Sequence, residues 1–432
     1  MVRLAVIADD LTGANDTAVQ FAKHGIGTSV QIDAAQERVN PLDTDVIVLN
    51  TDSRDMNRAD AYEKVKIAAT LLKKQQVEHV YKKVDSTLRG NFGTEIAAMA
   101  DVFQPELIVI APAFPKNKRI TVGGYHFLEG VPIEMTEIGK APKTPVHDSY
   151  IAGLIEAQLG RCPVLIPLAI IKQGAPIVKK AIAAYLLAGQ HWIIFDIVKD
   201  EHFETILEAV AAYRNILWVG SAGLADHLPK FYEWQPGPKI QAEPAEGPVL
   251  IVAGSVSCKT QLQIAQARQE KSLSLVKIDM PALFVKEKVE ISRCAREIQT
   301  GLSSGADVLL VSSIDDSDVE QAFQAGKKCG LSGKEVSEYT AQTIATIVEK
   351  LDLTHLTGMF LTGGDTAVHV LKKLGATDVE ILSEISTGIP LGRLRGGSCD
   401  GLKVVTKAGA FGEKDCFVRA MEVIRGVFRE DV

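Results

Sequence analysis

The sequence has no apolar run long enough to cross a bilayer, and its N-terminus lacks a signal-peptide pattern. Its six cysteines are scattered without a C-x-x-C pair and its nine histidines show no metal-ligand spacing, so a disulfide framework and a zinc site are disfavoured. The net charge of -7 argues against a general nucleic-acid binder. We therefore expect a cytoplasmic protein with small-molecule partners and no nucleic acid or membrane among them. The sequence leaves a homo-oligomer open.

Two common nucleotide-binding motifs are also missing. No G-x-x-x-x-G-K-[ST] occurs, because GLSGK at 330–334 has the wrong spacing and is interpreted as a loop beside a helix. The absence of G-x-G-x-x-G disfavours a nicotinamide cofactor. A nucleotide would therefore have to be held by turns of another kind.

The chain of 432 residues is too long for one ordinary core and predicts two domains. The segment QPGPKIQAEPAEG at 235–247 holds three prolines and almost no large apolar side chain, which is typical of a linker. We expect domains at 1–234 and 248–432. On both sides of the linker, short apolar runs alternate with helical patterns, so two α/β domains with mainly parallel sheets are predicted.

The stretch KKVDSTLRGN at 82–91 gathers an unusual number of polar and charged side chains at one predicted turn. It follows a predicted strand at 77–81 and precedes a helical pattern that starts at Gly93. Such turns lie at the carboxyl edge of the strands, where ligands bind in open α/β sheets. Ser86 and Thr87 are expected to cap the helix, whose free N–H groups favour an anion.

Two other polar segments are expected at the same edge. Asp9 and Asp10 end the apolar run 2–8, with Thr12 as the expected helix cap, and Arg54 follows the run 46–49. Guanidinium and ammonium groups suit a carboxylate, whereas carboxylates suit hydroxyls and one of them can accept a proton. The first domain therefore predicts a site for a small polyhydroxy acid, and a hairpin predicted at 121–132 could form a lid.

The second domain has small, flexible residues at three predicted strand ends: Gly254-Ser255, Thr362-Gly363-Gly364 and Ala408-Gly409. Glycines let backbone N–H groups approach a phosphate chain, and the helix after Asp365 would point its N-terminus at that chain. The sequence thus favours a nucleotide in the second domain, facing the acid across an interdomain cleft.

These segments together resemble the four-carbon acid sugar kinase family. The resemblance rests on IADDLTGANDTA (7–18), NTDSR (50–54), KKVDSTLRGN (82–91), PAFP (112–115), TGGDTA (362–367) and KAGAFG (407–412), which cover essentially the whole chain in order. The opening ADDLTGANDTAVQFAK is most similar to the D-threonate kinases, with the D-erythronate kinases close behind. The resemblance implies phosphorylation of the terminal hydroxyl of D-threonate, D-erythronate or 3-oxo-tetronate, with ATP and Mg²⁺ as cofactors.

The resemblance implies that the acid is held by Asp10, Arg54, Lys82, Lys83, Val84 and Asp85, to which the residue pattern adds Asp9, Ser86 and Arg89. It implies that ATP is held by Ser255 or Ser257, by Thr362, Gly363, Gly364 and Asp365, and by Gly409. No metal ligand is assigned.

Three aspartates are candidates for the catalytic base. Asp365 at a helix start suits nucleotide phosphates and magnesium better than proton abstraction, because a helix start lowers an Asp pKa. Between the other two, we predict Asp85 as the base and Asp10 as the residue that orients substrate hydroxyls, with the exchanged roles as the alternative. A lyase or aldolase and a non-catalytic sensor of sugar acids are the rival classes.

Overall fold

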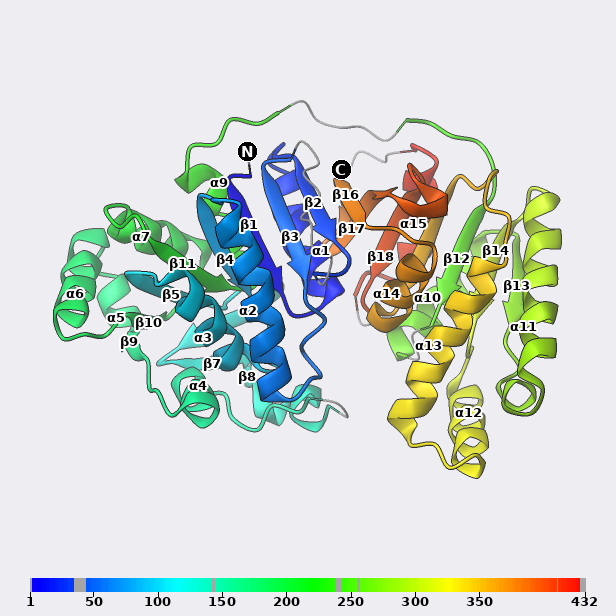
Figure 1. The fold of residues 1–432 in the computed structure, drawn as a ribbon, viewed down its shortest axis with the longest axis horizontal. Helices are drawn as coiled ribbons and strands as arrows, with labels where there is room; N and C mark the ends of the chain where they lie inside the picture. The colour runs from blue at the N-terminus through cyan, green and yellow to red at the C-terminus, as the bar shows by residue number, and fades with distance from the viewer. Residues whose placement is uncertain are drawn as a thin grey trace. The chain divides into compact units, whose positions relative to one another are not determined.

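The computed structural model describes residues 2–34, 44–141, 144–237, 243–254, 257–409 and 411–427. The chain divides into two compact units, Met1–Pro238 and Lys239–Val432 (Figure 1). Part of the expected linker at 235–247 lies outside the described residues. Among the helices of the described segments, none combines the length and apolarity needed to cross a membrane.

The first unit is built on eight parallel strands in the order β2-β3-β1-β4-β11-β5-β10-β9. Their central members are buried along their whole length, which is why they appear in the sequence as continuous apolar runs. The strand bounds are β1 Leu4–Ala8, β2 Thr28–Gln31, β3 Val46–Asn50, β4 His79–Lys83, β5 Leu107–Ala111, β9 Val164–Ile166, β10 Trp192–Phe195 and β11 Ile216–Gly220.

Helices cover both faces of this sheet. α2 (Arg58–Lys74), α3 (Phe92–Phe103) and α4 (Ile151–Leu159) pack side by side. α1 (Leu11–Ala22) packs against α8 (Ala222–Ala225), and α6 (Ala175–Leu187) against α7 (Asp200–Val210). Because β1-α1-β2 crosses the sheet in the opposite direction to β3-α2-β4, right-handed crossovers place α1 and α2 on opposite faces.

A small antiparallel sheet interrupts the alternation, where the sequence predicts a hairpin. Its strands are β6 (Arg119–Val122), β7 (Tyr125–Leu128) and β8 (Val131–Pro132). The turn between β6 and β7 is Gly123-Gly124, both at positive φ, and its two N–H groups donate to Asp196 just after β10. The predicted hairpin is confirmed, and its role as a lid stays a prediction.

The second unit has parallel strands in the order β13-β14-β12-β15-β18, extended by the antiparallel strands β17 and β16. The prediction of mainly parallel α/β sheets is thus confirmed. The strand bounds are β12 Val249–Ala253, β13 Leu273–Lys277, β14 Asp307–Val311, β15 Gly358–Thr362, β16 Asp378–Ser386, β17 Ile389–Arg395 and β18 Lys403–Lys407.

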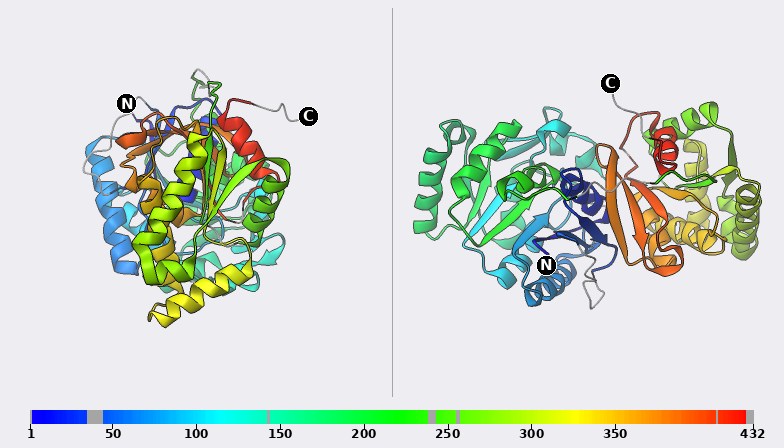
Figure 2. Two further views of the ribbon diagram at one scale, coloured as in Figure 1. Left: turned by 90° about the vertical axis from the view of Figure 1, so that its right-hand side faces the viewer. Right: turned by 90° about the horizontal axis from the view of Figure 1, so that it is seen from above.

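In the second unit α10 (Cys258–Glu270) packs against α15 (Cys416–Ile424). A second group packs together, as the turned views also show (Figure 2): α11 Met280–Ser303, α12 Asp316–Lys328, α13 Gly333–Glu349 and α14 Gly364–Lys373. Residues 330–332 of the GLSGK segment lie between α12 and α13, as predicted, whereas Gly333 and Lys334 begin α13, where Ser332 forms a capping box with Glu335.

Several elements differ from the sequence-based expectation. The strand β4 ends at Lys83, so Lys82 and Lys83 lie inside the strand and not in the turn after it. The elements β2, α4, β9, α11 and α12 were not predicted. The helix α11 carries many charged residues and is kinked at Lys286, whose φ of -137° is non-helical, so its apolar periodicity is broken.

Candidate active site

Asp9 and Asp10 follow β1 at the carboxyl edge of the first sheet. Asp10 is the N-cap of α1 and accepts a hydrogen bond of 2.7 Å from the N–H of Gly13. The expectation that Thr12 caps this helix is therefore wrong, because Thr12 already lies in its first turn. A Cβ on Gly13 would lie 2.7 Å from Asp10 Oδ1 and 2.9 Å from Lys83 Nζ, so a larger residue there would displace these two side chains.

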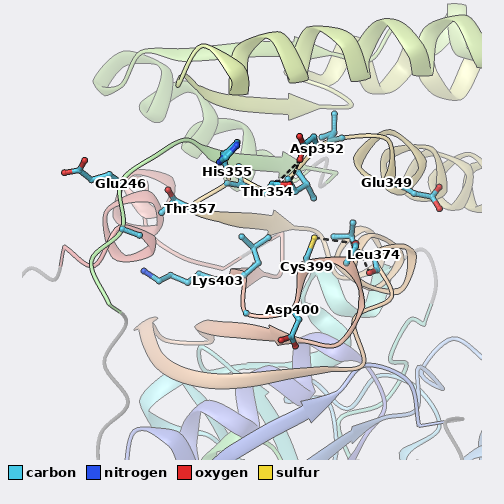
Figure 3. Close-up of a pocket in the computed structure, with 17 residues that line it drawn as sticks. Glu246, Glu349, Asp352, Thr354, His355, Thr357, Leu374, Cys399, Asp400 and Lys403 are labelled. Atoms are coloured by element: carbon cyan, nitrogen blue, oxygen red, sulfur yellow. Dashed lines mark hydrogen bonds between the residues drawn. The ribbon is translucent and has the colours of Figure 1, made fainter.

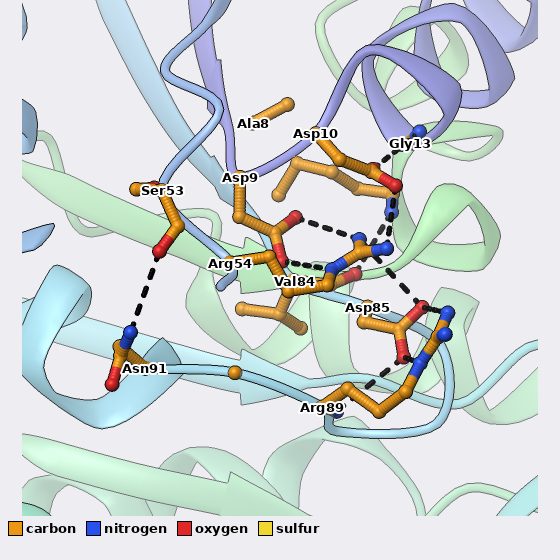
Figure 4. Close-up of polar contacts among 12 residues, drawn as sticks. Ala8, Asp9, Asp10, Gly13, Ser53, Arg54, Val84, Asp85, Arg89 and Asn91 are labelled. Atoms are coloured by element: carbon orange, nitrogen blue, oxygen red, sulfur yellow. Dashed lines mark hydrogen bonds and ion pairs between the residues drawn. The ribbon is translucent and has the colours of Figure 1, made fainter. Parts of the chain in front are cut away.

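Arg54 joins the carboxylates of this edge (Figure 4). Its Nε and Nη2 donate to the two oxygens of Asp9 at 2.7 and 3.0 Å, and its Nη1 donates to Asp10 at 2.5 Å. Its Nη2 also lies 3.8 Å from Asp85 Oδ1. Described residues thus engage three of the five N–H groups of Arg54, and two remain for a ligand.

Asp85 forms a second centre in the turn after β4. Arg89 donates to both of its oxygens, at 2.6 Å from Nε and 3.1 Å from Nη2, and Thr87 donates to it at 2.5 Å. The helix α3 starts seven residues later at Phe92, and its N-cap is Asn91. The expectation that Ser86 and Thr87 cap this helix is therefore wrong, because the chain first makes an intervening turn.

The two lysines of β4 have different surroundings. Lys82 is fully buried, and its Nζ lies 2.7 Å from Glu95 Oε2 while it donates to the carbonyls of Ile7 and Lys83. Its charge is thereby paired with a carboxylate, and two of its three hydrogens are donated to carbonyls. Lys83 is 2% exposed and donates to the Val84 carbonyl at 2.9 Å.

Glu95 completes this buried pair and was not identified from the sequence. It lies in the first turn of α3, is 1% exposed, and also accepts a hydrogen bond of 2.7 Å from Ser53. A glutamate early in a helix is common at surfaces, so the sequence carried no signal that this one faces Lys82.

The three aspartates of this cluster differ in the direction in which their pKa values are shifted. Burial opposes the ionised form of Asp9, but Arg54 and both lysines outweigh it and lower the pKa of Asp9. For Asp85, Arg89 and Arg54 overcome burial and hold its pKa well below the usual value. For Asp10, burial together with the neighbouring carboxylates outweighs Arg54 and raises its pKa. Of these three aspartates, Asp10 is thus the one that is protonated most readily.

Arg119, the first residue of β6, interacts electrostatically with Asp85 of this cluster and was not identified from the sequence. Its Nη1 donates to the Asn117 carbonyl, while its buried Nε has no hydrogen-bond partner among the described residues. Burial lowers the pKa of Arg119, and Asp85 is the first of the carboxylates that oppose this effect. The adjacent strand is tied to the Asp85 turn, because His126 contacts the Ser86 carbonyl at 3.1 Å.

In the second unit, the predicted glycine-bearing strand ends lie at the carboxyl edge of neighbouring strands. Gly254 follows β12, and a Cβ on it would lie 2.0 Å from Thr366 Oγ1 in α14. Gly363 has a φ of +105° and directly precedes α14, whose first turn holds Gly364 and Asp365. Only glycine fits these two positions without strain.

Ser257 caps α10 and is connected to the turn after β18. Its hydroxyl donates to the Gly409 carbonyl at 2.8 Å and accepts from the Thr260 N–H at 3.2 Å. The structure thus brings Ser257 and Gly409 together. Ser255 lies outside the described residues.

Three buried hydroxyls at this edge have no hydrogen-bond partner within the described segments: Ser312 and Ser313 after β14, and Thr362 at the end of β15. The strands β14, β12 and β15 are neighbours. Unsatisfied buried polar groups are rare, and at a strand edge they fit a polar ligand such as a nucleotide. The pair Ser312-Ser313 directly after an apolar strand was the sequence signal that could have identified two of them.

Other candidate sites are weaker. In the described part of the chain no group of three His, Cys, Asp or Glu side chains could hold a metal ion. All six cysteines are free. A pocket of about 860 Å³ lies at the amino ends of β12, β15 and β18, lined among others by His355, Cys399 and Lys403 (Figure 3). It is thus at the opposite edge of the second sheet from the glycine-bearing turns.

Comparison with known proteins agrees with this division. A family model described as a sugar-binding N-terminal domain matches residues 4–228, and one described as a nucleotide-binding C-terminal domain matches residues 250–417. The chain is therefore a kinase with separate sugar-binding and nucleotide-binding domains. It belongs to the four-carbon acid sugar kinase family, as the sequence motifs predict, and the lyase and sensor alternatives are set aside.

Two relatives are 33% identical to this chain. One is a D-erythronate kinase of Heliobacterium modesticaldum, with 96% of this chain and 95% of the relative covered. The other is a D-threonate kinase of Salmonella typhimurium, with both chains covered completely. The fold is similar to that of a Salmonella typhimurium LT2 protein described as a putative tRNA synthase, with a TM-score of 0.83, 24% identity, and coverage of 97% of this chain and 99% of that one.

Proposed function

We propose that this kinase uses ATP to phosphorylate the terminal 4-hydroxyl of D-threonate, with D-erythronate and 3-oxo-tetronate as the alternative substrates. The observation that carries the proposal is the linked set of Asp9, Asp10, Arg54 and Asp85 in the sugar-binding unit. Three carboxylates provide acceptors for the hydroxyls of a polyol, and the cations among them suit its carboxylate. The motif at the N-terminus favours D-threonate, whereas the equal identity to both relatives supports either acid.

The substrate carboxylate needs cations with unused donors. Arg54 keeps two N–H groups and Lys83 two ammonium hydrogens that donate to none of the described residues. Arg119 adds a guanidinium whose Nε likewise lacks an acceptor within the described segments. We assign binding of the substrate carboxylate to Arg54, Lys83 and Arg119. Lys82 is assigned a positioning role, because its charge is already paired with Glu95 and it donates to two carbonyls.

For the base, the surroundings of the aspartates favour the exchanged roles, with Asp10 as the base. A general base works best when its pKa is not far below the working pH, and Asp10 is the one whose pKa is raised. Asp85 is held ionised by Arg89 and Thr87, which suits a group that orients cations and hydroxyls. Asp10→Asn should therefore lower kcat with both KM values kept, and Asp85→Asn should mainly raise the KM of the acid. Loss of turnover only in Asp85→Asn would instead make Asp85 the base.

The nucleotide-binding unit fits ATP at the carboxyl edge of its sheet. We assign the phosphates to Ser257, Thr362, Gly363, Gly364, Asp365 and Gly409, and add Ser312 and Ser313 on account of their hydroxyls, which are unpartnered within the described residues. ATP, when bound, supplies the phosphoryl group. Mg²⁺ is usually held by one or two carboxylates together with substrate phosphates, so a single residue such as Asp365 is a sufficient protein contribution.

A comparison of four-carbon acids tests the proposal. ADP release is measured with ATP at saturation and with D-threonate, D-erythronate, 3-oxo-tetronate and the L-enantiomers of the first two varied. We expect the highest kcat/KM for D-threonate and a lower value for the L-acids. If D-erythronate or 3-oxo-tetronate gives a tenfold higher kcat/KM, the substrate assignment is wrong while the kinase assignment holds.

A further inference from the structure

Lys407, the last residue of β18, has a buried ammonium group surrounded by neutral oxygens. The side chain is 2% exposed. Its Nζ lies 3.0 Å from the carbonyls of Ala408 and Gly409, and 3.3 Å from the Phe411 carbonyl and from Thr260 Oγ1. Four oxygens from two segments thus enclose one positive charge.

No carboxylate in the described residues forms an ion pair with this ammonium. Burial is the main cause that lowers the pKa of Lys407 to about 8; of its neighbours, Cys416 of α15 acts to raise this pKa and the positive charge of Lys259 of α10 acts to lower it. A buried charge without a counter-charge is costly unless oxygen dipoles replace its water. The four oxygens supply those dipoles.

Three of the four enclosing oxygens are carbonyls of the turn that the sequence assigns to nucleotide binding, and the fourth is the Thr260 hydroxyl of α10. The same turn is held from α10 by Ser257 and Thr260, which donate to Gly409, and by Gln263, which donates to the Phe411 carbonyl at 3.0 Å. In a trans peptide the N–H points opposite to the C=O. The carbonyls of Ala408 and Phe411 point toward the ammonium, so the N–H groups of the next residues point away from it. Backbone N–H groups directed away from the ammonium are available to bind an anion such as a phosphate.

We propose that the Lys407 ammonium is a built-in monovalent cation that holds the turn after β18 in its nucleotide-binding shape. A ring of carbonyl and hydroxyl oxygens is the donor set that potassium and ammonium ions take in proteins. Lys407 is a positioning residue, since it acts through the turn, and the inference rests on the proposed nucleotide site. The native enzyme should then need no added monovalent cation, and removing the side chain should create a site for one.

The test compares Lys407→Ala, Lys407→Met and the native enzyme, with the exposed Lys414→Ala as the matched control. The KM of ATP is measured in choline, sodium, potassium and ammonium chloride at equal ionic strength. We expect the native enzyme and the control each to have the same KM of ATP in all four salts. In choline, we expect the KM of ATP for Lys407→Ala to be at least tenfold above the native value. Ammonium or potassium should bring this KM back most strongly. For Lys407→Met no cation should restore the KM, because the methionine side chain fills the site. The KM of the acid should not change.

The inference is overturned if Lys407→Ala has the native KM of ATP in choline, if no cation lowers a raised KM, or if the KM of the acid rises equally. A native enzyme that does not use ATP would instead overturn the proposed function. Should neither variant fold, the native enzyme suffices: its KM of ATP should rise toward tenfold per pH unit above about pH 8, as the ammonium loses its proton. A flat profile from pH 7 to about 9.5 would overturn the inference.

Discussion

Arg54→Met removes the cation that links the carboxylates of the sugar-binding unit. Arg54 makes three hydrogen bonds to Asp9 and Asp10, of which the two to Asp9 are almost fully buried. Breaking a buried pair from one side costs about 3–5 kcal/mol, because the partner charge stays buried. Since Asp10 is 24% exposed, the lower end of this range applies, and we expect a loss of about 3 kcal/mol at neutral pH.

The destabilisation caused by Arg54→Met should become smaller as the pH falls. Without Arg54, we expect burial to raise the folded-state pKa of Asp9 above its unfolded value, so that the folded state binds more protons than the unfolded state. The free energy of unfolding of the variant then rises as the pH falls from the folded-state pKa toward the unfolded one, by about 1.4 kcal/mol for each pH unit between the two values. In the native protein the pKa of Asp9 is lowered, so its stabilising contribution is present above the unfolded pKa and is lost as the pH falls.

Tryptophan fluorescence during urea unfolding measures this effect in the sugar-binding unit alone, because Trp192, Trp218 and Trp234 all precede residue 239. Arg58→Met is the matched control, since Arg58 is exposed and donates to a backbone carbonyl. The difference between the Arg54 variant and the native protein should narrow between pH 7.5 and 5. A difference below 1 kcal/mol, or one that does not change with pH, would refute the reasoning.

Three other changes should have separable effects. Glu95→Gln leaves the buried ammonium of Lys82 without its counter-charge, so the free energy of unfolding should fall by about 3–5 kcal/mol. A fall of less than about 1 kcal/mol would show that the ion pair does not stabilise the fold. Asp10→Asn should lower kcat by about 10²–10⁴-fold with the folded state kept, as rapid-quench turnover would show. Gly254→Ala places a methyl group 2.0 Å from a threonine hydroxyl of α14, so the KM of ATP should rise at least tenfold, whereas Gly333→Ala, with 3.5 Å of space, should leave it unchanged.

The strands and the glycine-bearing turns could be predicted because their signals are local. A buried parallel strand is a short apolar run, and β5 (Leu107–Ala111) is buried along its whole length. The turn at Gly363 requires glycine because of its positive φ, which is a local property, whereas Gly254 requires it because of Thr366 in α14. Family membership followed from several such turns occurring in order.

The rest of the site depends on contacts between distant segments. Lys82 of β4 pairs with Glu95 in α3, and Arg54 belongs to the carboxylate cluster through Asp9, 45 residues away. Arg119 interacts electrostatically with Asp85, and its sheet is joined to the Asp85 turn by the contact of His126 with the Ser86 carbonyl. Such side-chain partners are set by packing, so the sequence could identify the edge of the sheet but not the hydrogen bonds along it.

The position of the phosphate on the product tests the central claim most directly. The enzyme is incubated with ATP and D-threonate, and the product is analysed by proton-coupled phosphorus NMR, with Asp10→Asn as the parallel sample. Phosphorylation of the terminal hydroxyl places the phosphate beside a methylene group, so we predict a phosphomonoester signal split by two protons, formed far more slowly by Asp10→Asn. A signal split by one proton, or ADP release without any organic phosphate, would contradict the account.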